Sequence, residues 1–232
     1  MKCPKCVQGI HRTAQQCPHC GFSMADLDEQ FGEGEVLMRR LSDAAGVLKV
    51  KQRHQVEKWF DQFERSFPQL FFSVYFGSLE EMANLRQFGL WLLNRAAFED
   101  VGLDRPNDGA IMLVVDVEAK TACVSYGYLL DLFLTEEDTF QVLSIGHPYF
   151  LQGDYYKGLS AIVRKLTAIL RKRVRHARRN PDQYERLAGR GSEGVEGILR
   201  RIRSGSEAAS PGREAQHSQS TPRSQNQERS YH

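Results

Sequence analysis

Two Cys-x-x-Cys pairs lie within the first twenty residues, and they constrain the fold more than any other feature of the chain. The stretch MKCPKCVQGIHRTAQQCPHCG supplies four cysteines, Cys3, Cys6, Cys17 and Cys20. Four thiolates in two such pairs suit the tetrahedral shell of a closed structural Zn²⁺ site. One pair alone could be a redox dithiol, but two pairs at this spacing indicate a zinc ribbon. A module this short has no core of its own, so metal binding must supply its folding free energy.

We expect neither the two histidines near these pairs nor the fifth cysteine of the chain to be a metal ligand or a nucleophile. His11 and His19 are alternative nitrogen ligands, but four thiolates already fill the shell, so we expect both imidazoles to face solvent. Cys123 lies in an apolar alternating run, where a small core residue is expected instead of a nucleophile. Thiolates available for zinc are typical of a reducing compartment. Because the sequence shows no run long enough to span a bilayer and no signal peptide, we expect a cytoplasmic location.

The formal net charge of +2 is divided unevenly along the 232 residues. Residues 1–163 carry a net charge of −7, whereas residues 164–232 carry +9. The basic part suits an anionic membrane surface, nucleic acid or the acidic body of the protein itself, and charge alone does not choose among them. A solvated helix end, whose cations complement the helix dipole, is the alternative without a partner. Tyr184 and Tyr231 are the two tyrosines of the tail, and this low content of residues that could stack on bases disfavours single-stranded nucleic acid.

Hydrophobic periodicity predicts alternating helices and strands from residue 36 to residue 179. The expected elements are a short helical segment at 36–41, a helix at 50–67 ended by Pro68, a strand at 70–76, a helix opened by a Ser78–Glu81 capping box, strands at 110–117 and 120–127 joined by a two-residue turn, and helices that begin at Thr135 and Asp154. A strand, a crossover helix and a second strand form a parallel unit, to which the hairpin adds a third strand. The predicted fold class is therefore α/β, a small mixed β-sheet with helices on both faces.

The pattern divides the chain into four parts. We expect a zinc ribbon at 1–24, a Gly- and acid-rich linker at 25–40, an α/β domain at 41–175 and a basic, largely disordered tail at 176–232. The Ser, Gln, Arg and Gly content of the tail cannot bury enough apolar surface to offset the entropy of ordering. A short helix around 195–203, with Ile198, Leu199 and Ile202 on one face, is the alternative within it.

Three stretches carry a resemblance to a known family. In order they are PNDGAIMLVV, ACVSYGYLL and PYFLQGDYYKGL. They resemble the TPM domain family, the thylakoid-lumen acid-phosphatase-like domains, over about residues 41–170. That family has Asp-Asn-Gly before a hydrophobic strand, Gly-Tyr-Gly-Leu-Glu after the next strand and a late Gly-Asp-Tyr helix start, and it includes versions with an N-terminal zinc ribbon. The resemblance implies an α/β/α sandwich, and it covers acid phosphatases, divalent-ion binders and factors that assemble or repair membrane complexes.

The resemblance also implies a divalent-ion site, for calcium or magnesium, at Asp43, Asp108 and Asp154. The sequence departs from the family pattern where Leu129 replaces the glutamate of Gly-Tyr-Gly-Leu-Glu. A hard cation such as Ca²⁺ takes six or more oxygen ligands, so this change removes both a charge and a ligand, and Asp131 is displaced by two residues. Each of the three acids also has a structural interpretation, as a turn residue or as a helix or turn cap.

The sequence shows neither the Gly-x-Ser-x-Gly elbow of a hydrolase nor a phosphate-binding P-loop. Any phosphatase reaction would therefore depend on a divalent ion and its activated water. We expect a binding or assembly module with structural zinc and a protein partner, with or without weak divalent-ion-dependent phosphatase activity. A genuine phosphatase is one alternative. An adaptor that binds nucleic acid or an anionic membrane through the ribbon and the basic tail is another.

Overall fold

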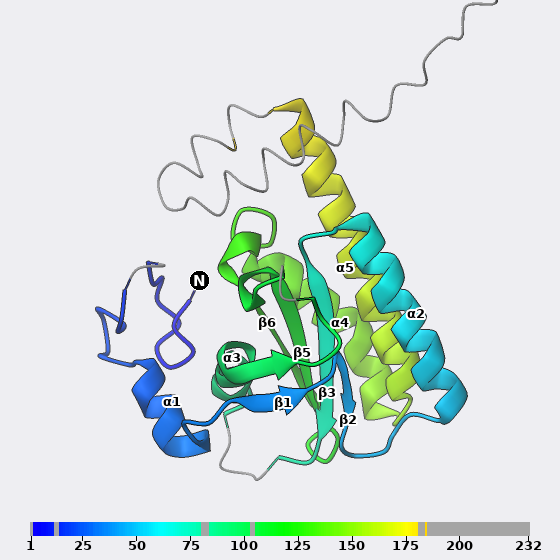
Figure 1. Ribbon diagram of the computed structural model, residues 1–232, viewed down its shortest axis with the longest axis horizontal. Helices are drawn as coiled ribbons and strands as arrows, with labels where there is room; N and C mark the ends of the chain where they lie inside the picture. Colours follow the sequence, from blue (N-terminus) through cyan, green and yellow to red (C-terminus); the bar gives the residue numbers. More distant parts are fainter. Residues whose placement is uncertain (1, 12–13, 80–83, 103–104, 181–183, 185–232) are drawn as a thin grey trace, which may run out of the picture.

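The computed structural model describes residues 2–11, 14–79, 84–102, 105–180 and 184, and a four-stranded sheet lies at its centre (Figure 1). The strands are β2 (Leu41–Asp43), β3 (Phe71–Gly77), β5 (Ala110–Asp116) and β6 (Thr121–Tyr126), in the order β2-β3-β5-β6. The first three are parallel and β6 is antiparallel to β5. The three longer strands confirm the prediction, including the parallel unit and the hairpin.

The hairpin turn is longer than predicted. Asp116 pairs with Thr121, so four residues connect β5 to β6 instead of two. The Asp116 carboxylate accepts hydrogen bonds from the backbone N–H groups of Glu118 and Ala119, at 3.0 and 3.2 Å, and Lys120 takes a positive φ of 53°. An Asp side chain that binds the backbone two residues on stabilises such a turn, which accounts for the extra length.

Side chains of the central strands alternate between two cores, as the period of a strand requires. One core contains Phe72, Val74 and Phe76 of β3 and Ile111, Leu113 and Val115 of β5, and it is covered by α2 (Val50–Ser66), α4 (Glu136–Leu151) and α5 (Tyr155–Arg179). Figure 1 shows these three helices together on one face of the sheet. The predicted helix starts at Thr135 and Asp154 are confirmed as N-caps.

The second core lies on the opposite face, and it includes residues of the N-terminal segment. It contains Phe71, Met112 and Val114 of the sheet together with α3 (Leu85–Arg95), α1 (Met24–Phe31) and a parallel two-stranded ladder of β1 (Val36–Met38) and β4 (Ala96–Phe98). Helices on both faces confirm the predicted α/β sandwich. Two short 3₁₀ turns, η1 (Asn107–Gly109) and η2 (Tyr128–Leu130), flank β5 and β6.

Two local predictions were wrong. The segment 36–41 forms strand β1 and the start of β2 instead of a helix, because Val36 to Met38 pair with Ala96 to Phe98. Helix α3 begins at Leu85, where the Asn84 side chain accepts hydrogen bonds from two backbone N–H groups. Glu81 of the predicted capping box lies outside the described residues, and the Ser78 hydroxyl donates to Glu118 instead.

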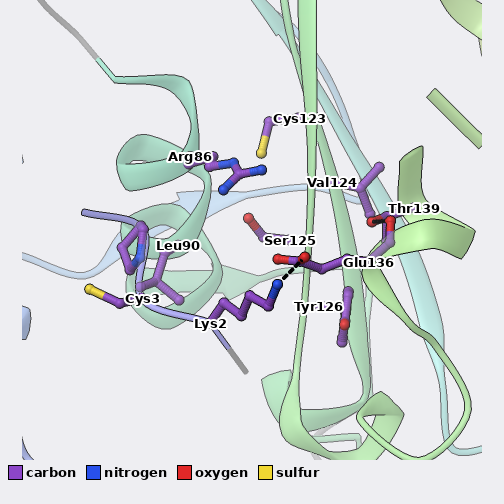
Figure 2. Close-up of a pocket in the computed structure, with 11 residues that line it drawn as sticks. Lys2, Cys3, Arg86, Leu90, Cys123, Val124, Ser125, Tyr126, Glu136 and Thr139 are labelled. Atoms are coloured by element: carbon purple, nitrogen blue, oxygen red, sulfur yellow. Dashed lines mark hydrogen bonds and ion pairs between the residues drawn. The ribbon is translucent and has the colours of Figure 1, made fainter. Parts of the chain in front are cut away.

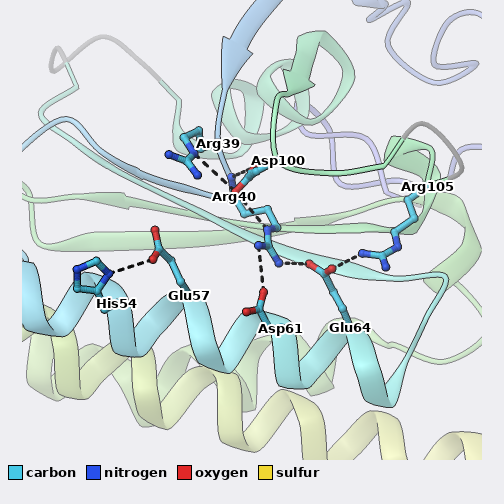
Figure 3. A network of polar contacts seen from close by, with 8 residues as sticks. All are labelled: Arg39, Arg40, His54, Glu57, Asp61, Glu64, Asp100 and Arg105. Carbon is cyan, nitrogen blue, oxygen red and sulfur yellow. Dashed lines mark hydrogen bonds and ion pairs between the residues drawn. The ribbon is translucent and has the colours of Figure 1, made fainter.

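An ion-pair network joins the ladder to α2 (Figure 3). Arg40, between β1 and β2, reaches Glu64 and Asp61 of α2 and Asp100 after β4. Its side chain is only 12% exposed, and Arg105 binds the other oxygen of Glu64. The network therefore connects elements that pack on different faces of the sheet.

Of the tail predicted at 176–232, the structure describes residues 176–180 and 184. Helix α5 continues to Arg179, past the predicted domain boundary at 175, and Tyr184 stacks on the Phe133 ring with centroids 5.8 Å apart. The predicted disorder and the alternative helix at 195–203 lie outside the described residues. None of the helices in the described ranges is both long and apolar enough to cross a membrane.

Candidate functional site

The four N-terminal cysteines converge on one point. Their sulfur atoms all lie within 4.8 Å of one another, and the Cys3–Cys20 and Cys6–Cys17 distances are both 3.6 Å. Tetrahedral zinc with Zn–S bonds of about 2.3 Å places its sulfurs about 3.8 Å apart, so the cluster fits a metal such as zinc. The four predicted ligands are therefore brought together as expected.

Each knuckle has the same backbone turn. The carbonyl of Cys3 accepts a hydrogen bond from Val7 N–H, and the carbonyl of Cys17 accepts one from Gly21 N–H, both at 2.9 Å. Val7 and Gly21 both have positive φ, 64° and 71°, a conformation that Gly adopts without strain and Val rarely adopts. The repeated turn aims both Cys pairs at the same centre.

The ribbon is packed on the α/β domain and shares its second core. Cys3 is 0% exposed and Cys17 is 2% exposed, and both belong to the cluster that contains Leu27 of α1 and Trp91 of α3. The Trp91 indole N–H donates to the carbonyl of Gly32 at 2.9 Å. The linker predicted at 25–40 thus contains helix α1, which packs on α3, and strand β1, which pairs with β4 (Figure 1).

A polar pairing adds to this docking. Arg95 of α3 binds the Asp28 carboxylate of α1 with two N–H groups, and this hydrogen bonding lowers the pKa of Asp28 below its usual value. Lys2 of the ribbon forms an ion pair with Glu136 at the start of α4. The ribbon is therefore held from two directions, by α3 and by α4.

A pocket of about 110 Å³ lies at the seam between the ribbon, α3 and β6 (Figure 2). In Figure 2 Arg86 extends from α3 toward Cys123 of β6, while Lys2 reaches across to Glu136. Burial raises the pKa of the Cys123 thiol above its usual value, so the thiol stays protonated and is not an activated nucleophile. The seam is thus a surface to which ribbon and domain both contribute.

Asp43 is engaged by groups of its own domain. Its side chain is 0% exposed, and its carboxylate accepts hydrogen bonds from the backbone N–H groups of Val47 and Leu48, at 2.9 and 3.0 Å. The Arg53 guanidinium lies 2.9 Å from Oδ2. Asp43 therefore caps a turn, one of the two roles that the sequence allowed, and a guanidinium stands where a cation would bind.

Asp43 lies level with the C-terminal ends of strands β3 and β5, whereas Asp108 lies just before the N-terminal end of β5. The strand register aligns Asp43 with Phe76 of β3 and with Val115 near the end of β5, whereas Asp108 precedes the first residue of β5. A strand rises about 3.3 Å per residue, so the two ends of β5 are about 20 Å apart. Asp43 and Asp108 therefore cannot bind the same ion.

Asp154 caps helix α5, as its position in the sequence also suggested. Its carboxylate accepts a hydrogen bond from Lys157 N–H at 3.1 Å and forms an ion pair with the Lys157 ammonium at 2.7 Å. The next residue, Tyr155, donates its hydroxyl to the carbonyl of Val117 in the hairpin turn. Asp154 thus lies toward the end of the strands at which Asp43 lies. Among the residues that the structure describes, however, only the four cysteines form a group of three or more potential metal ligands.

The motif residues around Asp108 are explained by packing. The Asn107 amide donates to the carbonyls of Leu93 and Ala96, at 3.0 and 2.7 Å, and so satisfies the end of α3. A Cβ on Gly109 would lie 2.4 Å from the Gln69 carbonyl oxygen, and one on Gly127 would lie 2.2 Å from the Asp108 carbonyl oxygen. Gly127 thus permits the turn after β6 to contact the turn before β5, and Gly109 permits the turn before β5 to contact the backbone that precedes β3.

Replacing Gly127 by Ala is expected to destabilise the domain by about 1 to 3 kcal/mol, because the added methyl group meets backbone atoms that cannot rotate away. Urea unfolding of the variant measures this loss. Gly34→Ala is the matched control, since nothing lies within 4 Å of a Cβ at Gly34. Equal stability of the two variants would contradict the close packing of these turns.

Two charged residues in these sites were not singled out from the sequence. Arg53 binds Asp43 from ten residues away, and Asp116 holds the hairpin turn. An acid that ends an apolar strand and precedes a turn was a local signal for Asp116. Arg53 had no such signal, because the pairing depends on how α2 packs beside β2.

Comparisons with known proteins show what this chain is similar to. The family model described as TPM domain matches residues 41–169. One similar solved structure is the N-terminal domain of the cg2496 protein from Corynebacterium glutamicum, with 11% identity, a TM-score of 0.44 and coverage of 56% of this chain and 79% of that one. Another is the N-terminal domain of a protein from P. gingivalis, with 21% identity, a TM-score of 0.44 and coverage of 57% and 82%. A search of curated proteins gives no match.

Proposed function

Because the chain belongs to the TPM domain family over residues 41–169, we propose that it is a zinc-ribbon TPM protein that acts as a binding and assembly module. The observation that carries this proposal is the state of Asp43. Its buried carboxylate is already satisfied by Arg53 and by two backbone N–H groups. The chain's own residues thus occupy the acid that the resemblance assigns to an ion.

Phosphate hydrolysis has little support in this arrangement. A divalent ion that activates water needs several oxygen ligands directed at one point. Asp43 and Asp108 lie at opposite ends of the parallel strands, and the Asp154 carboxylate caps the N-terminus of α5. Asp43 therefore serves a turn and Asp154 serves a helix cap.

A binding role is favoured by the fixed position of the ribbon. Zinc held by Cys3, Cys6, Cys17 and Cys20 would be structural, since four thiolates leave no open position for chemistry. The ribbon and α3 form one surface with a pocket at their seam, on which a protein partner in a reducing compartment, such as the cytoplasm, would dock. Arg86 offers this partner a cation on that surface.

The test is a hydrolysis assay on zinc-loaded full-length protein with an aryl phosphate and added Ca²⁺, Mg²⁺ or Mn²⁺. We expect turnover no higher than in protein-free controls, and no change for Asp43→Ala at a pH where that variant remains folded. Ion-dependent turnover that Asp43→Ala abolishes would overturn the proposal. Affinity capture with intact protein and with Arg86→Glu provides the positive test, because a partner of the seam should be retained less by the variant.

A further inference from the structure

The outer surface of α5 carries a set of cations without acidic partners. Among the described residues, Lys157 pairs with Asp154 and Arg173 pairs with Asp138. No ion pair with another described residue involves the remaining cations of the helix, which are Arg164, Lys165, Arg171, Lys172, Arg175, Arg178 and Arg179. Cations in this number are more than a helix C-terminus needs to complement its dipole, which acts only within the last turn.

A groove between α2 and α5 opens beside these cations. It has a volume of about 210 Å³ and is lined by Trp59, Gln62, Phe63, Ser160, Val163, Arg164, Thr167, Ala168 and Arg171. Two arginines and no carboxylate belong to this lining, while Trp59 and Val163 give it apolar walls. Arg171 crosses toward α2 and donates to the Ser66 hydroxyl at 3.2 Å. The groove thus suits an anionic group that is attached to apolar atoms.

Helix α4 adds exposed apolar side chains next to this region. It packs against α5 in the same layer, where Gly146 and Gly158 allow close approach. On its solvent side Phe140 is 71% exposed, Leu151 is 51% exposed and Ile145 is 41% exposed. Cations together with exposed apolar side chains are typical of a surface that binds at the membrane interface.

We propose that the layer of α2, α5 and α4 binds an anionic phospholipid surface, with a headgroup phosphate in the α2–α5 groove between Arg164 and Arg171. The inference goes beyond the proposed function, because the α2–α5 groove and the seam pocket have no lining residue in common. The phosphate meets the two guanidinium groups, and the glycerol and upper acyl carbons meet the apolar walls. The unpaired cations of α5 then contribute through the negative potential of the bilayer.

Nucleic acid fits these features less well. A duplex offers phosphates but no hydrocarbon chains that could cover the groove walls or Phe140 and Leu151. A single strand would need an aromatic face for stacking. The Trp59 ring is already stacked on Tyr156, with centroids 5.1 Å apart.

Trp59 fluorescence provides a direct test with zinc-loaded full-length protein. We expect phosphatidylserine-containing phosphatidylcholine vesicles to shift Trp59 emission to the blue, and vesicles of phosphatidylcholine alone to leave it unchanged. Trp59→Phe assigns the signal, because it leaves Trp91 in place. Arg164→Glu/Arg171→Glu should weaken vesicle binding by about tenfold or more, and added salt should weaken the wild type.

Two further variants separate the groove from general surface charge and test the exposed apolar side chains of α4. Arg39→Glu reverses an exposed cation outside this layer, and Phe140→Ser/Leu151→Ser changes only exposed side chains of α4. We expect Arg39→Glu to bind vesicles within about twofold of wild type, although it changes the net charge by two units at one surface position. We expect Phe140→Ser/Leu151→Ser to bind more weakly than wild type.

Three results would overturn the inference: no vesicle binding, equal losses for Arg39→Glu and the groove variant, or a stronger Trp59 response to a DNA duplex than to vesicles. Each leaves the proposed binding function standing, whereas ion-dependent aryl phosphate turnover that Asp43→Ala abolishes would overturn that function itself.

Discussion

Replacing Cys17 by Ser is expected to lower the melting temperature of the whole α/β domain by about 10 °C or more. Zinc in a thiolate site contributes a folding free energy on the order of 10 kcal/mol to an isolated ribbon. Here the ribbon is part of the second core, since Cys3 and Cys17 are buried with Phe22, Leu27 and Trp91. Loss of the metal site therefore exposes the side of α3 that the ribbon covers, instead of unfolding an independent appendage.

The fluorescence of Trp91 reports on the docking of the ribbon, because its indole N–H donates to the Gly32 carbonyl and its ring centroid lies 5.4 Å from that of Phe31. Thermal melts followed by tryptophan fluorescence should shift for Cys17→Ser and for chelator-treated wild type alike. Cys123→Ser is the matched control, since Cys123 lies on β6 and outside the metal cluster. A melt unchanged by chelator would mean that the ribbon does not stabilise the domain.

The docking of the ribbon also limits how zinc could influence binding. The seam pocket has Lys2 and Cys3 on one side and Arg86, Ser125 and Tyr126 on the other, so its shape depends on a folded ribbon. The α2–α5 groove lies on the other face of the sheet and has no ribbon residue in its lining. Zinc removal should therefore affect a protein partner at the seam before it affects vesicles at the groove.

The layered fold could be predicted because its main elements are long and periodic. Strands β3 and β5 are seven-residue apolar runs, and α2 and α5 repeat apolar residues at helical spacing. Strands β1, β2 and β4 have three residues each, which is too few to show a period. Helix α1 was missed although Ser23 and Asp26 form a capping box, because the acidic composition around it suggested a linker.

The two candidate sites differ in how much of their geometry is local. The zinc ligands could be predicted because two short knuckles with fixed spacing define a tetrahedral set. Whether Asp43, Asp108 and Asp154 converge depends on the strand register and on the end of the sheet at which each turn lies, and the sequence specifies neither. Asp43 and Asp154 could be recognised as caps from their neighbours, but the partner of Asp43, Arg53, depends on the tertiary packing of α2.

Arg40→Ala is expected to lower the free energy of unfolding by about 3 kcal/mol or more, because it leaves the carboxylates of Glu64 and Asp100 without this counter-charge. The Glu64 side chain is 11% exposed and the Asp100 side chain is 20% exposed. Figure 3 shows both carboxylates directed at the Arg40 guanidinium. Burial alone would lower the pKa of Arg40, but the carboxylates of Glu64 and Asp100 raise it above its usual value. The backbone N–H of Arg40 also donates to Asp100 at 2.9 Å, so the residue anchors the ladder through two kinds of contact.

Arg39 provides the matched control for this clamp. It is the adjacent residue, its side chain is 62% exposed and its nearest contact with Asp100 is 3.8 Å. Arg39→Ala should change stability by less than about 0.5 kcal/mol in the same urea titration. Arg40→Ala/Glu64→Gln should recover part of the loss, because the second change removes one uncompensated charge while Arg105 can still bind the amide oxygen. If Arg39→Ala and Arg40→Ala lost the same stability, the network would be a solvated surface cluster, and the ladder would be held to α2 by packing alone.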